Sequence, residues 1–212
     1  KLPVSLELGL TSLVVALILG ITLGVIAAIK RNTWMDYFSS AIAMTGICIP
    51  TFVLGPLLVL VFAIHLGWFN ASGWYTSYDR VLPAATLGLV YSAYVARLTR
   101  GGMLEILNQD YIRTARAKGS PERTVLFKHA LRNAALPILT VAGLQFGNLI
   151  SGALLVETVF NWPGMGRLAF ESILRRDYPT IMGVLFFASA MVVIANILTD
   201  ISYRWADPRL RG

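Results

Sequence analysis

The chain alternates long apolar segments with shorter polar ones. Four segments lack Asp, Glu, Lys and Arg and hold 22, 28, 24 and 22 residues: Leu8–Ile29, Tyr37–Ile64, Asn133–Val156 and Tyr178–Thr199. About 20 helical residues are enough to cross the hydrocarbon core of a bilayer. A fifth segment, Val81–Ala96, is shorter and can span if Arg97 and Arg100 extend their charged ends to the interface. The pattern therefore predicts an all-α, polytopic transmembrane helical bundle with five spans in this chain.

The polar stretch Asn108–Pro137 separates two of these apolar segments. Asp110 is placed to cap a first helix, and Gly119 suits the left-handed residue that closes a turn after a helix end. Ser120 can cap a second helix that has Pro121 at its first position. A basic loop that only fixes the orientation in the membrane is the simpler interpretation, but caps on both sides of one glycine favour a built surface.

The basic residues are concentrated in one part of the chain. Residues 97–132 hold eight basic and three acidic residues, out of 18 basic and 11 acidic residues in all. Together with Lys30, Arg31 and the C-terminal tail, this stretch places 13 basic residues on one side of the membrane and five on the other. Because short loops rich in Lys and Arg stay in the cytoplasm, the richer side is predicted to be cytoplasmic. Because the excess of basic residues is concentrated in this stretch, it argues against nucleic acid as a partner.

Two glycine pairs lie one helical turn apart within the apolar segments, Gly20 with Gly24 and Gly143 with Gly147. Glycines at this spacing let a second helix approach closely, which is how helices associate in lipid. Chance spacing is an equal alternative, because glycine is common in membrane helices.

Two prolines, Pro50 and Pro56, interrupt the apolar segment Tyr37–Ile64. Each proline removes a backbone donor and predicts a bend in the helix. A bent helix can line a transport pathway or can be a static packing feature, and the sequence leaves both open.

Apart from Asn133 at their edge, the last two apolar segments contain three amide side chains: Gln145, Asn148 and Asn196. Amides in a bilayer are costly unless they are paired or face water, so we predict that these residues line a translocation pathway. Hydrogen bonding between helices is the alternative.

The sequence carries no common catalytic or metal-binding motif. It has no Gly-x-x-x-x-Gly-Lys-Ser/Thr phosphate loop, no His-Glu-x-x-His and no Gly-x-Ser-x-Gly. The single cysteine, Cys48, lies in an apolar segment, and the two histidines, His65 and His129, are predicted on opposite sides of the membrane. We therefore expect a chain without covalent chemistry, a metal site or an ATP site of its own.

Two blocks of the polar stretch resemble the cytoplasmic signature of ABC-importer permeases, closest to the dipeptide/oligopeptide/nickel branch. Tyr111–Gly119 reads YIRTARAKG, His129–Ala134 reads HALRNA, and Leu136–Pro137 follows. The general permease pattern begins with Glu-Ala-Ala and ends with Ile-x-Leu-Pro. This chain has Arg113-Thr114-Ala115 at the first part and His129-Ala130-Leu131-Arg132 at the second, which are departures typical of the branch.

The resemblance covers nearly the whole chain, from Leu2 to Arg211. It includes the segment Glu157–Arg167, which resembles the branch's extracytoplasmic segment between its last two spans. The resemblance implies one permease domain over residues 1–212 with the type I ABC-importer permease fold. Within that domain, residues 97–137 form the cytoplasmic coupling-helix region and residues 157–180 the extracytoplasmic segment, which is a gate, a docking surface or a plain structural cap. Relatives carry one further N-terminal span, so six spans are expected in the intact protein.

The resemblance also implies a function and a set of partners. The chain would be a multi-pass subunit in the bacterial inner membrane, paired with a second permease subunit and two ATPase subunits. An extracytoplasmic substrate-binding protein would deliver peptides, and ATP and Mg would sit on the ATPase subunits. The expected ATPase-contacting residues are Arg113, Thr114, Ala115, Arg116, Lys118 and Gly119, with Val125, Leu126, His129 and Ala130 on the second helix.

Two alternatives stay open. Within the branch, the substrate could be nickel or glutathione, because selectivity largely resides in the binding protein. Outside it, a channel or carrier that is not coupled to ATP is disfavoured, because carriers usually place ionisable residues at mid-membrane and the long apolar segments lack them.

Overall fold

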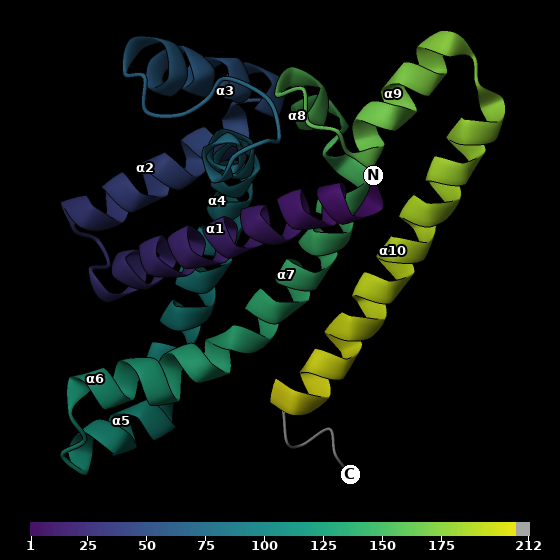
Figure 1. Ribbon diagram of the computed structural model, residues 1–212. Helices are drawn as coiled ribbons and strands as arrows, with labels where there is room; N and C mark the ends of the chain where they lie inside the picture. The colour runs from purple at the N-terminus through teal and green to yellow at the C-terminus, as the bar shows by residue number, and fades with distance from the viewer. Residues whose placement is uncertain (207–212) are drawn as a thin grey trace.

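The computed structural model describes residues 1–206, including the side chains of all of these except 136, 148–152 and 203–206. Every regular element in this part of the chain is a helix (Figure 1). Segments η1 and η3 are π-helical, and η2 is a short 3₁₀ helix. In chain order the elements are α1 (Leu2–Ile29), α2 (Trp34–Cys48), α3 (Thr51–Leu58), η1 (Val59–His65), η2 (Ser77–Arg80), α4 (Val81–Leu107), α5 (Asp110–Ala117), α6 (Glu122–Thr124), η3 (Val125–Leu131), α7 (Arg132–Gly152), α8 (Leu154–Val159), α9 (Met165–Arg175) and α10 (Tyr178–Ala206).

Three helical stretches of the described residues are long and apolar enough to cross a membrane: Leu2–Ile29, Ser77–Leu107 and Tyr178–Ser202. By length and composition they match the first, third and last predicted spans. The third predicted span lies in α4, a single helix that continues past its apolar part to Leu107. The predicted fourth span corresponds to α7, whose described apolar part is Pro137–Gly147.

The predicted second span is broken in two. α2 ends at Cys48, α3 begins at Thr51, and the axis turns by 109° between α2 and the continuous helix α3–η1. Pro50 cannot donate a backbone hydrogen bond, and Ile49 before it is extended (φ −87°, ψ 117°), as residues before proline prefer to be. The bend predicted at Pro50 is thus confirmed, whereas Pro56 lies inside α3 without ending it.

The first glycine pair brings α1 against α4. A Cβ atom built on Gly20 would lie 2.5 Å from the Val95 Cβ, and one on Gly24 would lie 2.6 Å from the Thr99 Cβ. Since no side chain fits at such distances, the predicted close approach is confirmed for this pair. In the second pair, Gly143 meets Thr199 of α10 in the same way.

Buried apolar residues gather toward the two ends of the α1–α4 pair. One cluster joins the start of α1 to α8 and the start of α4, with Leu8, Leu82 and Trp162 almost fully buried. The other joins the end of α1 to the end of α4 and to the polar stretch after it, through Val25 and Met103. Both ends of the pair are therefore fixed by packing.

The segment after α7 folds around a buried carboxyl group. Glu157 in α8 is fully buried and accepts hydrogen bonds from the Ser5 hydroxyl (2.6 Å) and the Arg167 backbone N–H (3.0 Å). Ser5 Oγ itself accepts a hydrogen bond from the Met165 N–H (2.7 Å). These bonds tie the start of α1 to the turn between α8 and α9.

α9 and α10 form a hairpin in which α10 returns past α7 (Figure 1). Arg176 takes a left-handed conformation (φ 56°) and ends α9. The Asp177 carboxylate then accepts hydrogen bonds from the Thr180 N–H (3.2 Å) and hydroxyl (2.6 Å), which fixes the start of α10.

Candidate functional site

The polar stretch between α4 and α7 forms the predicted helix, glycine turn and helix. Gly119 has φ +77°, the left-handed conformation that glycine adopts without a steric penalty. The Ser120 N–H donates to the Ala115 carbonyl (3.2 Å) and the Gly119 N–H to the Arg116 carbonyl (2.9 Å). This pair of bonds is the Schellman arrangement, which ends a helix by turning the chain back on itself.

The predicted caps are wrong at both helices. Asp110 is the first helical residue of α5 instead of its cap, and its side chain lies 3.5 Å from Arg113 in an exposed ion pair. Ser120 is taken up by the turn, so Pro121 stands at the cap position of α6 and no side chain caps this helix. The Schellman turn already bonds the Ser120 N–H, and the extended backbone of Pro121 (φ −62°, ψ 142°) starts the helix one residue later.

The helix pair formed by α5 and by α6 with η3 is anchored to the rest of the chain by apolar side chains. Ile112 of α5 and Val125 and Ala130 of η3 are all fully buried, and they pack with Met103 near the end of α4. Burying a side chain the size of Ile112 or Val125 contributes roughly 1.5–3 kcal/mol. The pair is therefore a fixed part of the fold.

An ion pair closes the turn from the outside. Arg116 of α5 meets Glu122 of α6 with both of its arms, at Nε–Oε2 3.2 Å and Nη2–Oε1 2.7 Å. The bonded Arg116 guanidinium holds the pKa of the Glu122 carboxyl below its ordinary value. Both side chains are about half exposed, so the pair adds at most about 1 kcal/mol, and its main effect is on orientation.

The ten residues predicted to contact an ATPase divide into three groups by exposure. Val125 and Ala130 face the chain's own core, where they support the surface without being part of it. The half-buried members are Ala115, Leu126 and His129. The exposed members are Arg113, Thr114, Arg116, Lys118 and Gly119.

Two large exposed side chains on the same helix pair were missed by the sequence analysis. Tyr111 is 44% exposed and Phe127 is 59% exposed. The Tyr111 hydroxyl accepts a hydrogen bond from the Asn133 amide (2.9 Å), which also donates to the His129 carbonyl (2.8 Å). An aromatic residue inside an otherwise polar, basic stretch was the signal that could have identified them.

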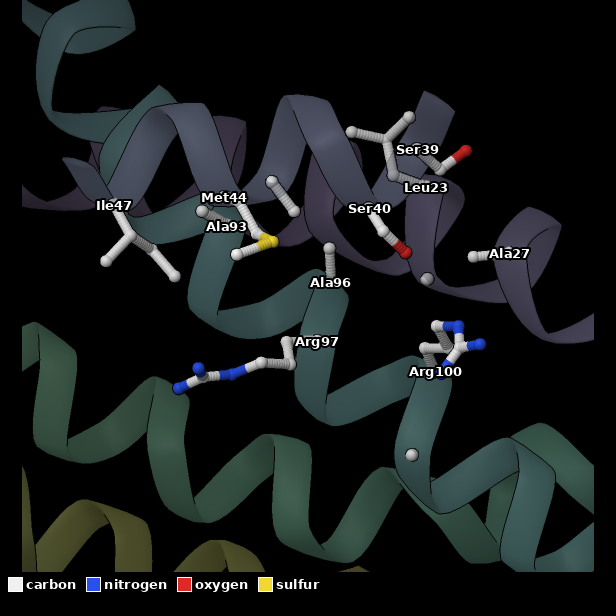
Figure 2. A pocket seen from close by; sticks show the side chains of 13 residues that line it. Leu23, Ala27, Ser39, Ser40, Met44, Ile47, Ala93, Ala96, Arg97 and Arg100 are labelled. Atoms are coloured by element: carbon white, nitrogen blue, oxygen red, sulfur yellow. The ribbon is translucent and has the colours of Figure 1, made fainter. Parts of the chain in front are cut away.

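The predicted pathway residues lie on two neighbouring helices, α7 and α10. Gln145 is half-buried on α7, and Asn196 is exposed on α10. The side chain of Asn148 lies outside the described residues. A cavity of about 340 Å³ lies elsewhere, between α1, α2 and α4 (Figure 2). Residues lining it include Leu23, Ser40, Met44, Ala96, Arg97 and Arg100.

An ion pair at one end of this cavity joins α2 to α4. Arg100 donates to both oxygens of Asp36, at 2.7 Å from Nε and 2.8 Å from Nη2, and Asp36 is almost fully buried. The pair holds Arg100 against the first turn of α2. Asp36 directly precedes the apolar segment Tyr37–Ile64. A search for uncharged segments therefore did not identify it as a partner for Arg100.

Among the described residues, no three His, Cys, Asp or Glu side chains form a group that could hold a metal ion.

Known proteins similar in sequence cover almost the whole chain. The family described as binding-protein-dependent transport system inner membrane component matches residues 20–212. The dipeptide transport system permease protein of Bacillus subtilis is 46% identical over 209 residues, which cover 99% of this chain and 68% of that protein. The glutathione transport system permease protein of Escherichia coli K12 is 45% identical over 207 residues, covering 98% of this chain and 68% of the relative.

Solved structures of distant sequence share the fold. An inward-facing structure of the MetNI methionine ABC transporter superposes with a TM-score of 0.81 at 18% identity, over 97% of this chain and 94% of the other. A crystal structure of an amino acid ABC transporter superposes with a TM-score of 0.70, also at 18% identity, over 94% and 89% of the two chains. Taken with the family match, these findings confirm the predicted permease fold. The chain belongs to the inner membrane components of binding-protein-dependent transport systems and is a permease subunit of an ABC importer.

Proposed function

We propose that this chain is one of two permease subunits in an importer that carries short peptides across the bacterial cytoplasmic membrane. It forms one half of the translocation pathway, and a second permease forms the other half. Two ATPase subunits bind at the cytoplasmic side and hold the ATP and Mg²⁺. A binding protein outside the membrane delivers the peptide, and this chain contributes no catalytic site.

The anchored helix pair α5–η3 is the observation that carries the coupling role. Its buried side, with Ile112 and Val125 at 0% exposure, is continuous with the end of α4. Its outer side presents exposed basic and aromatic residues, among them Arg113, Lys118 and Phe127. A surface that is rigidly joined to two membrane helices can transmit a displacement from a docked subunit to those helices.

In the proposed mechanism, ATP binding closes the ATPase dimer and moves the docked helix pair. The pair carries the ends of α4 and α7 with it, and the pathway changes from inward-open to outward-open. ATP can shift this equilibrium only if the ATPase dimer binds one conformation of the permeases more tightly than the other.

Short peptides are the substrate class that the relatives favour. Both relatives named above are permeases for small peptides, because glutathione is itself a tripeptide. Nickel transport is the competing possibility within this branch, and no metal-binding group lies among the described residues to support it.

Co-purification tests the proposal directly. The full-length tagged subunit, extracted from its native membrane in mild detergent, is expected to bring a second permease and ATPase subunits with it. ATP hydrolysis by the complex should increase when the cognate binding protein and a peptide are added together. A chain that purifies alone and transports without ATP would be a carrier, and the proposal would be wrong.

A further inference from the structure

Arg97 carries a positive charge in a membrane helix and has no acidic partner among the described side chains. Arg100, one turn further along α4, is held by both oxygens of Asp36. Arg97 instead lies near the ring of Tyr94, with its guanidinium carbon 6.0 Å from the ring centre. Arg97 is exposed, and a cation in a membrane is costly unless it meets an anion, backbone carbonyls or water, or extends to the interface, so an anionic ligand would stabilise it.

Arg97 lies well before the level at which the neighbouring helix α1 ends. α1 and α4 lie side by side, and a Cβ on Gly24 of α1 would be 2.6 Å from the Ala96 carbonyl, so Arg97 is level with Gly24. Lys30, just after the end of α1, is six residues further on, roughly 9 Å along the helix. Tyr94 lies in the opposite direction, toward the helix start. The guanidinium thus lies on the side of Arg97 that faces the start of α4, away from the level of Lys30.

The cavity in front of Arg97 has the size and lining of a ligand site. Its volume of about 340 Å³ falls within the roughly 300–1,000 Å³ that ligand pockets occupy. Leu23, Met44 and Ala96 give it an apolar wall, and Ser40 adds a hydroxyl (Figure 2). Figure 2 also shows the Arg97 and Arg100 side chains leaving α4 in different directions, so the Asp36 pair does not occupy Arg97.

We propose that Arg97 binds the terminal carboxylate of a transported peptide within this cavity. The inference rests on the proposed function as a peptide permease. A guanidinium can donate two parallel hydrogen bonds to a carboxylate, and the apolar wall accommodates the peptide's side chains. A bare divalent metal ion would be repelled by the same charge, so the site takes substrates with a free carboxylate.

The test uses the complete transporter in a detergent whose headgroup carries no phosphate. The binding protein is left out, so that only the permease can recognise the peptide. Met44→Cys places a thiol on the cavity wall, and Cys48→Ser removes the native one. The reaction of this chain with N-ethylmaleimide is followed by mass spectrometry. Dialanine should slow the labelling at least threefold, whereas dialaninamide, which lacks the carboxylate, should leave the labelling rate unchanged.

Substitution of Arg97 then assigns the protection. Arg97→Gln should raise the dialanine concentration needed for half-protection at least about tenfold, as expected for losing a charge-assisted pair. Arg97→Lys keeps the charge without the planar guanidinium. Its dialanine concentration for half-protection should lie between those of the parent and of Arg97→Gln. Arg31→Gln removes the same charge just after the end of α1 and outside the cavity. In this control, dialanine should protect the thiol as strongly as in the chain that keeps both arginines.

Several outcomes would overturn the inference. Equal protection by dialaninamide, or unchanged protection in Arg97→Gln, would show that the carboxylate does not meet this residue. Protection by added phosphatidylglycerol but not by dialanine would assign the site to a lipid. Loss of the second permease from Arg97→Gln, without dialanine protection of the parent, would assign it to a partner's carboxylate.

Uptake separates this inference from the proposed function. The unsubstituted complex in proteoliposomes, with its binding protein and ATP, is assayed for dialanine uptake. Uptake without cavity protection would overturn the Arg97 site alone. Absence of uptake and of peptide-stimulated ATP hydrolysis would overturn the peptide function and this inference with it.

Discussion

Glu157 shows how a single polar residue organises a part of the fold that is distant in sequence. Its carboxyl group is fully buried, and burial raises its pKa above the ordinary value of 4.5, although hydrogen bonds from Ser5 and the backbone oppose the shift. The partner Ser5 is 152 residues away in sequence. Gly164 is required beside it, because a Cβ there would collide with the carboxylate.

The raised pKa predicts a pH dependence of stability. The folded chain keeps the Glu157 proton at pH values where the unfolded chain has lost it. The stabilisation from this proton is therefore fully present below about pH 4.5 and is lost as the pH rises through the folded pKa. Glu157→Gln should remove this contribution, so thermal unfolding in detergent should vary less with pH than in the parent. Parallel pH profiles for the two proteins would contradict the assignment.

The Arg116–Glu122 pair allows surface charge to be separated from internal structure. Arg116→Glu should weaken association with the ATPase subunits, and more at low salt than at high salt, because exposed charges are screened. The double variant Arg116→Glu/Glu122→Arg restores the pair within the chain but leaves position 116 negative. Recovery of binding in the double variant would mean that the ion pair matters, and not the charge presented by Arg116.

At the scale of elements, the turn between α5 and α6 is the feature most directly set by local sequence. Gly119 has open space around its Cα, with nothing within 4 Å of a Cβ built there. Its requirement is therefore conformational and comes from φ +77° alone. The neighbouring π-helical segment η3 then places Val125 and Ala130 inward, which the sequence did not reveal.

Gly119→Pro should abolish substrate-stimulated ATP hydrolysis while membrane insertion stays intact. Proline fixes φ near −65° and removes the N–H that bonds the Arg116 carbonyl, so the turn cannot form. Gly119→Ala is the milder control, because a left-handed alanine costs roughly 1–2 kcal/mol and meets no neighbour. The comparison is made on purified complexes, and normal stimulation in the proline variant would refute the coupling role.

At the scale of the whole molecule, the close contact of α1 with α4 holds the bundle together. The contact depends on Gly20, Gly24 and Gly88, each of which lies too close to the neighbouring helix for a side chain. Lipid offers no hydrophobic driving force between helices, so such close packing is a main source of their association.

Gly24→Ala tests this contact against a matched position. The new Cβ would lie 2.6 Å from the Ala96 carbonyl oxygen and the Thr99 Cβ, and the forced separation should cost about 1–3 kcal/mol. At Gly101, on α4, a Cβ meets nothing within 4 Å, so Gly101→Ala should be neutral or stabilise by up to about 1 kcal/mol. Unfolding of both variants in detergent measures the difference, and equal stabilities would show that the α1–α4 approach is not limiting.

The helical class, the first, third and last apolar spans and the glycine turn could be predicted because each depends on residues close together in sequence. A run of apolar residues specifies a span, Pro50 specifies a break, and Gly119 supplies a left-handed residue. The helix caps were mispredicted because Asp110 and Ser120 fit more than one position near a helix end, and the hydrogen bonds of the turn decided between them. The pathway amides Gln145 and Asn196 stay a prediction; neither lines the cavity between α1, α2 and α4.

The sequence by itself determined that this chain is an all-helical membrane permease, because apolar helices and the glycine turn follow from local composition and backbone preference. The tertiary structure alone decided which charged and polar side chains find partners. Asp36 reaches Arg100 across 64 residues and Glu157 reaches Ser5 across 152, whereas Arg97, three residues before Arg100, has no acid beside it among the described residues. Such pairings depend on how the helices cross in space, and the preferences of neighbouring residues along the chain do not contain that information.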